Sequence, residues 1–92
     1  MTPISAVIIT KNEEANIARC LAALSAIADD VVVIDSGSTD RTVEIAEKMG
    51  ARVVFRAFDN FMDQKNFGIA QAKFPHVLSV DADEVLDRKS VV

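Results

Sequence analysis

Several features that mark other classes of protein are scarce in this sequence of 92 residues. It has three glycines and two prolines, and half of its residues are hydrophobic, which is typical of a packed domain rather than of a disordered or fibrous chain. Its length suits one domain with a modest core. No apolar run approaches the ~18 residues of a membrane span, and no basic segment precedes a long apolar stretch at the N-terminus, so we expect no transmembrane segment.

Basic residues and cysteine are also scarce. Ten basic residues face 14 acidic ones, a net charge of −4, so we expect no nucleic-acid partner, whereas an acidic total suits cation binding. The single cysteine, Cys20, cannot form an intramolecular disulfide, and its neighbours indicate the interior of a helix. A packed thiol in a reducing compartment is the simplest interpretation, and we expect a cytoplasmic protein.

The glycine-rich motifs that bind phosphate are missing. No G-x-G-x-x-G follows the first apolar segment and no G-x-x-x-x-G-K-[ST] occurs anywhere, which disfavours ordinary dinucleotide and P-loop chemistry. No combination of nucleophile, base and orienting group stands out either. We therefore assign no catalytic residue within this chain.

Hydrophobic patterning predicts alternating strands and helices. Apolar segments without alternation predict strands buried on both faces, and apolar residues at helical spacing predict helices between them. The predicted strands are 4–9, 31–34, 53–55 and 77–80, and the predicted helices are 13–28, one ending at Gly50, and 61–72. Short connections in this order imply a three-layer, Rossmann-like α/β fold, with a mostly parallel sheet of about four strands and helices on both faces.

Three details of the helices are testable. Asn12 is predicted to be the N-cap of the first helix, with Glu13 at the positive end of its dipole. Ile27 is predicted to belong to the apolar stripe of that helix. Met49 is predicted to face the core from the second helix.

Polar residues follow three of the four predicted strands. Because ligands bind at the carboxyl ends of strands in open parallel sheets, these residues predict one binding rim. Each group also has an ordinary structural explanation, since such residues end strands, form turns and cap helices; their coincidence at one rim favours a site. The residues are Thr10, Lys11, Asn12 and Glu13, then Asp35, Ser36 and Ser38, and finally Asp81, Asp83 and Glu84.

The segment LSVDADE places two aspartates two positions apart. In an extended segment, Asp81 and Asp83 leave the same face and can meet one hard cation or its bound waters. Mg²⁺ and Mn²⁺ prefer such oxygen ligands and commonly add phosphate oxygens from a substrate. Glu84 fits a helix start or a solvated position better. Lys65 is the basic candidate near the rim, and a solvated helix lysine explains it equally well.

Three blocks together resemble inverting glycosyltransferase family 2, whose members use nucleotide-sugars and have a GT-A fold. The blocks are VIITKNEEANIARCL, VVVIDSGSTDRTVEIA and LSVDADE, with FMDQKNFGIAQA between the last two, and they span nearly the whole chain. The combination of TKNEE, DSGSTD and QKN resembles most the branch of lipopolysaccharide-core glucosyltransferases.

The resemblance implies roles for matching positions. Thr10, Asn12 and Glu13 would lie by the nucleotide of a UDP-sugar, and Asp35 would accept a hydrogen bond from uracil N3–H. In the same way, Lys65 would approach the base, and Asp81 and Asp83 would contact the ribose and a divalent cation, Mn²⁺ or Mg²⁺. Many members have a second acid where this chain has Ser36, which leaves the role of that position open.

Family catalytic domains are more than twice as long as this chain and carry the catalytic base in their second half. We therefore expect residues 1–92 to form a single nucleotide-sugar-binding domain, a fragment of a longer transferase and inactive alone. The glycan or lipid-linked acceptor would bind the missing C-terminal part. A position peripheral to the inner face of a bacterial membrane is compatible with such an acceptor.

Two alternatives from other classes remain at this point. A phospho-receiver-like signalling domain also gathers acids and Mg²⁺ at strand ends, but its third strand would need a phosphoacceptor aspartate where this chain has Phe55-Arg56-Ala57. A non-catalytic assembly module would instead pair the edge of the fourth strand with another copy.

Overall fold

Strands and helices alternate along the chain as predicted. The computed structural model describes residues 3–57 and 60–81. The strands and helices are β1 (Ile4–Thr10), α1 (Glu14–Ser25), β2 (Asp30–Asp35), α2 (Thr42–Lys48), β3 (Arg52–Phe55), α3 (Phe61–Ala70) and β4 (His76–Asp81). Asp83 and Glu84 lie outside the described residues.

The four described strands form one parallel sheet in the order β3-β2-β1-β4. The chain steps outward from β1 to β2 and β3, and then returns to the other side of β1 as β4. The carboxyl ends of β1 and β4 therefore flank the point where the strand order reverses, which is the usual place for a ligand in such a sheet. This arrangement confirms the predicted fold class.

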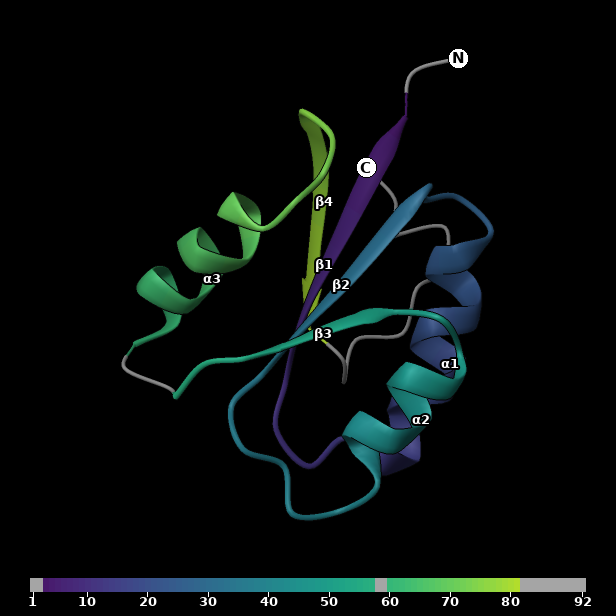
Figure 1. Ribbon diagram of the computed structural model, residues 1–92, viewed down its shortest axis with the longest axis vertical. Coiled ribbons are helices and arrows are strands. Elements are labelled where there is room, and N and C mark those ends of the chain that lie inside the picture. The colour runs from purple at the N-terminus through teal and green to yellow at the C-terminus, as the bar shows by residue number, and fades with distance from the viewer. Residues whose placement is uncertain (1–2, 58–59, 82–92) are drawn as a thin grey trace.

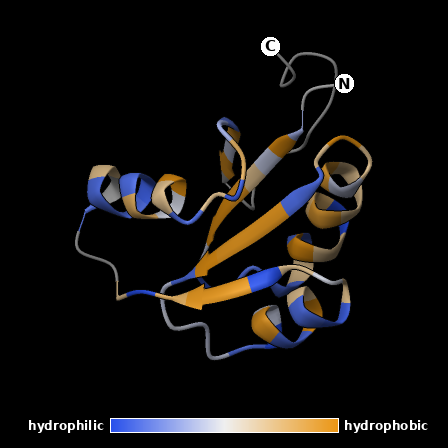
Figure 2. Ribbon diagram, turned by 45° about the horizontal axis from the view of Figure 1, so that its top comes forward, coloured by the Kyte–Doolittle hydropathy of each residue, from blue (hydrophilic) through white to orange (hydrophobic). Residues whose placement is uncertain are grey.

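The sheet is the middle of three layers (Figure 1). Helices α1 and α2 cover one face and α3 covers the other. The apolar side chains of β1 and β2 alternate between these faces, as in Ile8 and Val33 toward α1 and α2, and Val7 and Ile34 toward α3. Burial on both faces explains why these strands are continuously hydrophobic, as Figure 2 shows by colour.

Helix α3 lies unusually close to the sheet at Gly68. A Cβ atom on this glycine would lie 2.5 Å from Val7 Cγ1 and 3.2 Å from Ile34 Cγ1, which no side chain can occupy without movement. The buried face of α3 therefore carries Gly68 and, one turn earlier, the fully buried Gln64. This polar, small face is the reason why the apolar stripe of α3 is irregular in the sequence.

The predictions for two apolar residues, Ile27 and Met49, are wrong. Helix α1 ends at Ser25, so Ile27 lies beyond it and is 45% exposed. Helix α2 ends at Lys48, and Met49 is 39% exposed. In both cases the apolar spacing continues past the last helical turn, where the chain already bends toward the next strand. Among the described residues the longest helix has 12 residues, too short to cross a bilayer.

Candidate nucleotide-binding rim

The carboxyl ends of β1 and β2 are joined through their side chains. Thr10 and Asp35 are register partners at the ends of these strands, and the Thr10 hydroxyl donates a hydrogen bond of 2.7 Å to Asp35 Oδ1. On the other side of β1, the register pairs Ile9 with Asp81, the last residue of β4. Of the predicted site residues, Thr10 and Asp35 are therefore in contact, and Asp81 ends the strand on the other side of β1.

Asp35 is enclosed by hydrogen-bond donors. Its side chain is 2% exposed. Oδ1 accepts bonds from the hydroxyls of Thr10 and Ser38, and Oδ2 accepts bonds from the backbone N–H groups of Gly37 (3.0 Å) and Ser38 (2.8 Å). Burial raises the pKa of a carboxyl group, but these donors outweigh that effect, and the pKa of Asp35 lies below its usual value.

These four bonds bear on the role predicted for Asp35. A carboxylate offers about four lone-pair positions, so the donors of the chain itself already use all of them. A bond from uracil N3–H remains a prediction, and it requires one internal donor to give way. The hydroxyls of Thr10 and Ser38 are the donors that can rotate away, because the other two are fixed backbone groups.

Asn12 joins the two loops that follow β1 and β2, and it does not cap α1 as predicted. Its backbone has a φ of 54°, in the left-handed region that asparagine tolerates. Its side-chain oxygen accepts a bond of 2.7 Å from the backbone N–H of Thr39, and its own N–H donates to the Ser38 hydroxyl. The N-cap position belongs to Glu13, whose side chain makes no cap bond.

A second set of bonds joins the starts of α1 and α2. The backbone N–H of Glu13 donates to the Thr42 hydroxyl at 2.8 Å, and that of Glu14 donates to Asp40 at 3.1 Å. Asp40 also accepts bonds from the backbone and hydroxyl of Thr42. Figure 1 shows the two loops running side by side below the sheet. The rim is therefore fixed in shape by its own residues, and Glu13 lies half-buried within it.

A third group of residues extends the rim toward β3 and α3. Gln64 on α3 bridges Ser36, which follows β2, and Arg56, which follows β3. Gln64 and Arg56 were not among the predicted site residues. The sequence did contain a signal for Gln64. It lies four positions before Gly68 in a predicted helix, and this spacing places a polar residue and a glycine on the same helix face. Lys65 follows Gln64 on the helix, is half-buried, and has no salt-bridge partner among the described residues.

Among the described residues, no group of three or more His, Cys, Asp or Glu side chains is placed to hold a metal ion. The donors around Asp35 fit a buried structural carboxylate rather than a metal ligand. Asp81 is the last residue of β4, so its backbone lies at the carboxyl end of that strand, beside β1. Asp83, the other predicted metal ligand, lies outside the described residues.

The opposite, amino-terminal edge of the sheet has its own polar cluster. Asp30, 8% exposed, accepts bonds from Arg52 Nε and Nη2 at 3.1 and 2.9 Å, from the Ser5 hydroxyl and from the backbone N–H of Lys73. Burial opposes ionisation here too, but these donors hold the pKa of Asp30 below its usual value. The cluster ties β1, β2, β3 and the segment before β4 together.

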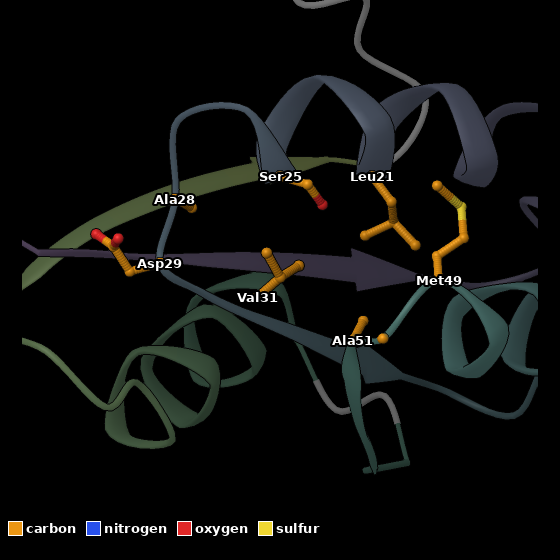
Figure 3. A pocket seen from close by; sticks show the side chains of 8 residues that line it. Leu21, Ser25, Ala28, Asp29, Val31, Met49 and Ala51 are labelled. Atoms are coloured by element: carbon orange, nitrogen blue, oxygen red, sulfur yellow. The ribbon is translucent and has the colours of Figure 1, made fainter.

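A small cavity of about 170 Å³ lies on the α1 and α2 side at this amino-terminal edge (Figure 3). It is lined by Leu21 and Val31 and by residues of the connection from α2 to β3, among them Met49 and Ala51. The half-exposed Met49 thus stands at a surface hollow instead of in the core. None of the predicted site residues lines this cavity.

Comparison with known proteins agrees with the fold. Residues 5–91 match the model of the family described as Glycosyl transferase family 2. An uncharacterized glycosyltransferase of Rickettsia bellii is 48% identical over 86 residues, which cover 94% of this chain and 29% of that protein. The lipopolysaccharide core biosynthesis glycosyltransferase LpsC of Rhizobium meliloti is 35% identical, over 94% of this chain and 33% of its own length.

A solved structure shares the same architecture. Glucosyl-3-phosphoglycerate synthase of Mycobacterium tuberculosis, crystallised with Mn²⁺, UDP-glucose and phosphoglyceric acid, superposes with a TM-score of 0.79 and 29% identity. The match covers 91% of this chain and 34% of the synthase. This chain therefore spans about a third of the length of the relatives and of the structure that it matches and corresponds to only part of each.

Proposed function

Because this chain belongs to glycosyl transferase family 2, we propose that it forms the donor-binding part of a glycosyltransferase that uses a UDP-sugar. The nucleotide would lie along the carboxyl ends of β1, β2 and β4. The observation that carries this proposal is the pairing of Thr10 with Asp35 at adjoining strand ends, inside two loops that are hydrogen-bonded to each other. A rim fixed in advance loses little conformational entropy when a ligand binds.

The choice of UDP rests on two arguments. The first is the chemistry of the rim, which offers hydroxyls, a carboxylate and the half-buried Lys65 to a polar base. The second is the likeness to a synthase crystallised with UDP-glucose. Thr10, Asn12, Glu13 and Asp35 contribute to the shape of this part of the site, and Lys65 would approach the base from α3.

A divalent cation, Mn²⁺ or Mg²⁺, would be held by Asp81 and Asp83. When bound, such an ion neutralises the diphosphate leaving group. Asp35 is not available as a ligand, because its four lone-pair positions are already used. Asp83→Asn keeps the size of the side chain and removes its charge, so it should reduce the Mn²⁺-dependent part of UDP binding, whereas Asp81→Asn should weaken binding with and without Mn²⁺. If the UDP affinity of the wild type and of both variants is the same in chelator as in Mn²⁺, the metal role is refuted.

The acceptor would be a glycan or a lipopolysaccharide-type lipid-linked sugar. The likeness to LpsC supports this class of acceptor. Transfer would proceed with inversion by one in-line displacement, and the base that deprotonates the attacking hydroxyl would come from residues beyond this chain. The residues described here bind and orient the donor only. Accordingly, the 92-residue chain alone should form no glycoside from UDP-sugars above a no-protein control.

Calorimetric titration with UDP, GDP and ADP, each with and without Mn²⁺, tests the proposal. We expect UDP to bind more tightly than either purine nucleotide, and more tightly with Mn²⁺ than without it. Equal affinities for the three nucleotides, or no binding of UDP, would refute the proposal.

The family match gives no support to the receiver-like alternative, and the end of β3 carries Phe55, Arg56 and Ala57 instead of a carboxylate. The assembly alternative has one observation in its favour, because β4 is an edge strand of the described sheet. Size-exclusion chromatography with and without Mn²⁺ and UDP distinguishes the assembly module from the donor-binding domain. A dimer that forms without nucleotide favours the assembly module, and a monomer at all protein concentrations excludes it.

A further inference from the structure

The loops that follow β1 and β2 hold each other through hydrogen bonds that run in both directions. Asn12, in the first loop, donates its backbone N–H to the Ser38 hydroxyl at 2.8 Å, and its side-chain oxygen accepts from the backbone N–H of Thr39 at 2.7 Å. The φ of Asn12 is 54°, in the left-handed region. In a residue other than glycine this conformation costs free energy, and it persists where the surrounding contacts enforce it.

The same kind of exchange joins the starts of α1 and α2. The backbone N–H of Glu14, the first residue of α1, donates to Asp40 Oδ2 at 3.1 Å. In return, Glu14 Oε1 accepts from the backbone N–H of Arg41, the N-cap of α2, at 3.1 Å. Between these contacts, the Glu13 N–H donates to the buried Thr42 hydroxyl. The two loops, side by side in Figure 1, therefore meet along a continuous row of hydrogen bonds.

Neither helix is capped by the side chain of its own N-cap residue. The N–H groups at a helix start need acceptors, and here each loop supplies one to the other. Asp40 accepts from the start of α1, besides its bonds to Thr42 in its own segment, and Glu14 accepts from the start of α2. If one loop moves away, the start of the other helix loses an acceptor, so each loop stabilises the other.

We propose that Asn12 and Glu14 are positioning residues that do not touch the UDP-sugar, and that they make the loops after β1 and β2 open and close as one unit. This unit includes Ser38, whose hydroxyl donates to Asp35, so its closed form sets the shape of the rim. The inference rests on the proposed function, because it assumes that UDP binds at this rim. The affinity for UDP then depends on the fraction of molecules in which the unit is closed.

The first test needs no ligand. Amide hydrogen exchange, followed by NMR, measures the opening of the Thr39 and Arg41 N–H groups. Asn12→Gly permits the left-handed backbone but removes the acceptor of Thr39, and Glu14→Ala removes the acceptor of Arg41. Each variant should speed exchange at its own partner by about threefold to tenfold, as for the loss of one hydrogen bond. Each should also speed exchange at the other amide, whose acceptor is intact.

Conservative variants separate the loss of the acceptor from other effects of the substitution. Asn12→Asp and Glu14→Gln each keep an acceptor oxygen, so both should restore slow exchange at Thr39 and Arg41. Glu47→Ala, the same exchange of residues at an exposed position of α2, is the matched control and should change neither amide. If Asn12→Gly does not fold, the pair Glu14→Ala and Glu14→Gln carries the test.

The second test is the affinity for UDP, measured by calorimetry in Mn²⁺. Asn12→Gly and Glu14→Ala should weaken UDP binding, but by no more than the factor by which amide exchange rises, because only the closed fraction changes. Glu14→Gln should recover most of the loss seen in Glu14→Ala. Glu47→Ala should bind UDP as the wild type does. A merely structural role of the two residues would leave the UDP affinity of the folded fraction unchanged.

The outcomes separate this inference from the proposed function. If each variant speeds exchange at its own partner alone, the loops are not one unit and the inference is overturned. Faster exchange at both amides with unchanged UDP affinity would also overturn it. A loss of affinity larger than the rise in exchange would indicate direct contact with UDP and would overturn it too. In these three cases the proposed function stands, whereas failure of the wild type to bind UDP would overturn both.

Discussion

Strand β2 begins and ends with a buried aspartate, and the chain holds the two carboxylates in different ways. Asp30, at the amino-terminal edge of the sheet, faces the guanidinium of Arg52 as well as neutral donors. Asp35, at the carboxyl edge, is held among the described residues by hydroxyls and backbone N–H groups alone. Both carboxyl pKa values are lowered despite burial, but only the charge of Asp30 has a described cation beside it.

The difference fits the proposed function, in which the amino-terminal edge of the sheet is held by an ion pair and the donor would bind at the carboxyl edge. Asp30 pairs with Arg52 on the neighbouring strand β3 and also accepts a bond from Ser5 on β1, so its charge is compensated and its role is structural. Asp35 is held by neutral groups among the described residues, so no described cation balances its negative charge, and a uracil N3–H could share it only if one internal donor gives way.

The largest effect is expected at Asp30. Asp30→Ala removes the shared acceptor of Arg52, the Ser5 hydroxyl and the Lys73 N–H. The buried Ser5 hydroxyl then has no acceptor, whereas the Lys73 N–H keeps its bond to Ser5 Oγ. The free energy of unfolding should fall by about 3 kcal/mol, as for a broken, partly buried ion pair. Urea denaturation measures it, with Glu47→Ala at an exposed position as control. A loss no larger than that of the control would show that the cluster is not structural.

Asp35→Asn should have the next largest effect on stability and a separate effect on binding. Asparagine keeps one acceptor oxygen, so its NH₂ group would face two of the four present donors. We expect the free energy of unfolding to fall by about 2 kcal/mol, and UDP to bind more weakly than to the wild type at the same temperature. Asp30→Asn serves as the comparison, because it should lower stability without changing UDP affinity in the folded fraction. Unchanged UDP affinity in Asp35→Asn would remove Asp35 from the site.

The acid side of the pH profile compares both carboxylates at once. Because each pKa is lower in the folded chain than the ordinary value of 3.8, folding favours the ionised form. This stabilisation is fully present above the ordinary pKa and is lost as the pH falls through the lower folded-state values. The free energy of unfolding should be flat from pH 7 to about pH 5 and should decline below about pH 4. Asp30→Asn and Asp35→Asn should each make the decline of the unfolding free energy with falling pH shallower. If the wild type and both variants show the same slope, Asp30 and Asp35 are not the carboxylates responsible.

The smallest effect on stability is expected at Glu44, which pairs with an arginine as Asp30 does. Glu44 binds Arg41 at 2.6 Å on the surface of α2, with half of its side chain exposed. Water screens this pair, and its partners lose side-chain entropy when they are held together. Glu44→Gln should leave the urea midpoint unchanged within error. A loss as large as that of Asp30→Ala would mean that burial does not explain the difference between the two arginine pairs.

Much of the fold could be predicted from residues alone. The apolar segments 4–9 and 31–34 predict strands covered on both faces, and the structure confirms both as β1 and β2. Predicted ends were less accurate, because Ile27 and Met49 continue the helical spacing after the hydrogen-bonded turns have stopped. Spacing reports which side of a helix is apolar, whereas the end of a helix depends on where the chain must turn to reach the next strand.

For the candidate site, too, the positions of the residues could be predicted from the sequence but their partners could not. Sequence alone determined that polar residues follow β1, β2 and β4, since strand ends and turn residues are local features, and the family blocks are written in consecutive residues. It did not determine the partners. That Asn12 bonds to the loop after β2 instead of capping α1, and that Asp35 has all four lone-pair positions occupied, depends on which loops the parallel register brings together.

Contacts between residues far apart in the chain depend on the tertiary structure. Gln64 meets Ser36 across 28 positions and Asp30 meets Lys73 across 43. No local pattern encodes such a pair, because each member has an ordinary local explanation as a polar helix residue or a turn residue. The close approach of α3 at Gly68 and the order β3-β2-β1-β4 bring them together, and the hydrogen-bond chemistry then decides which atom donates and which accepts.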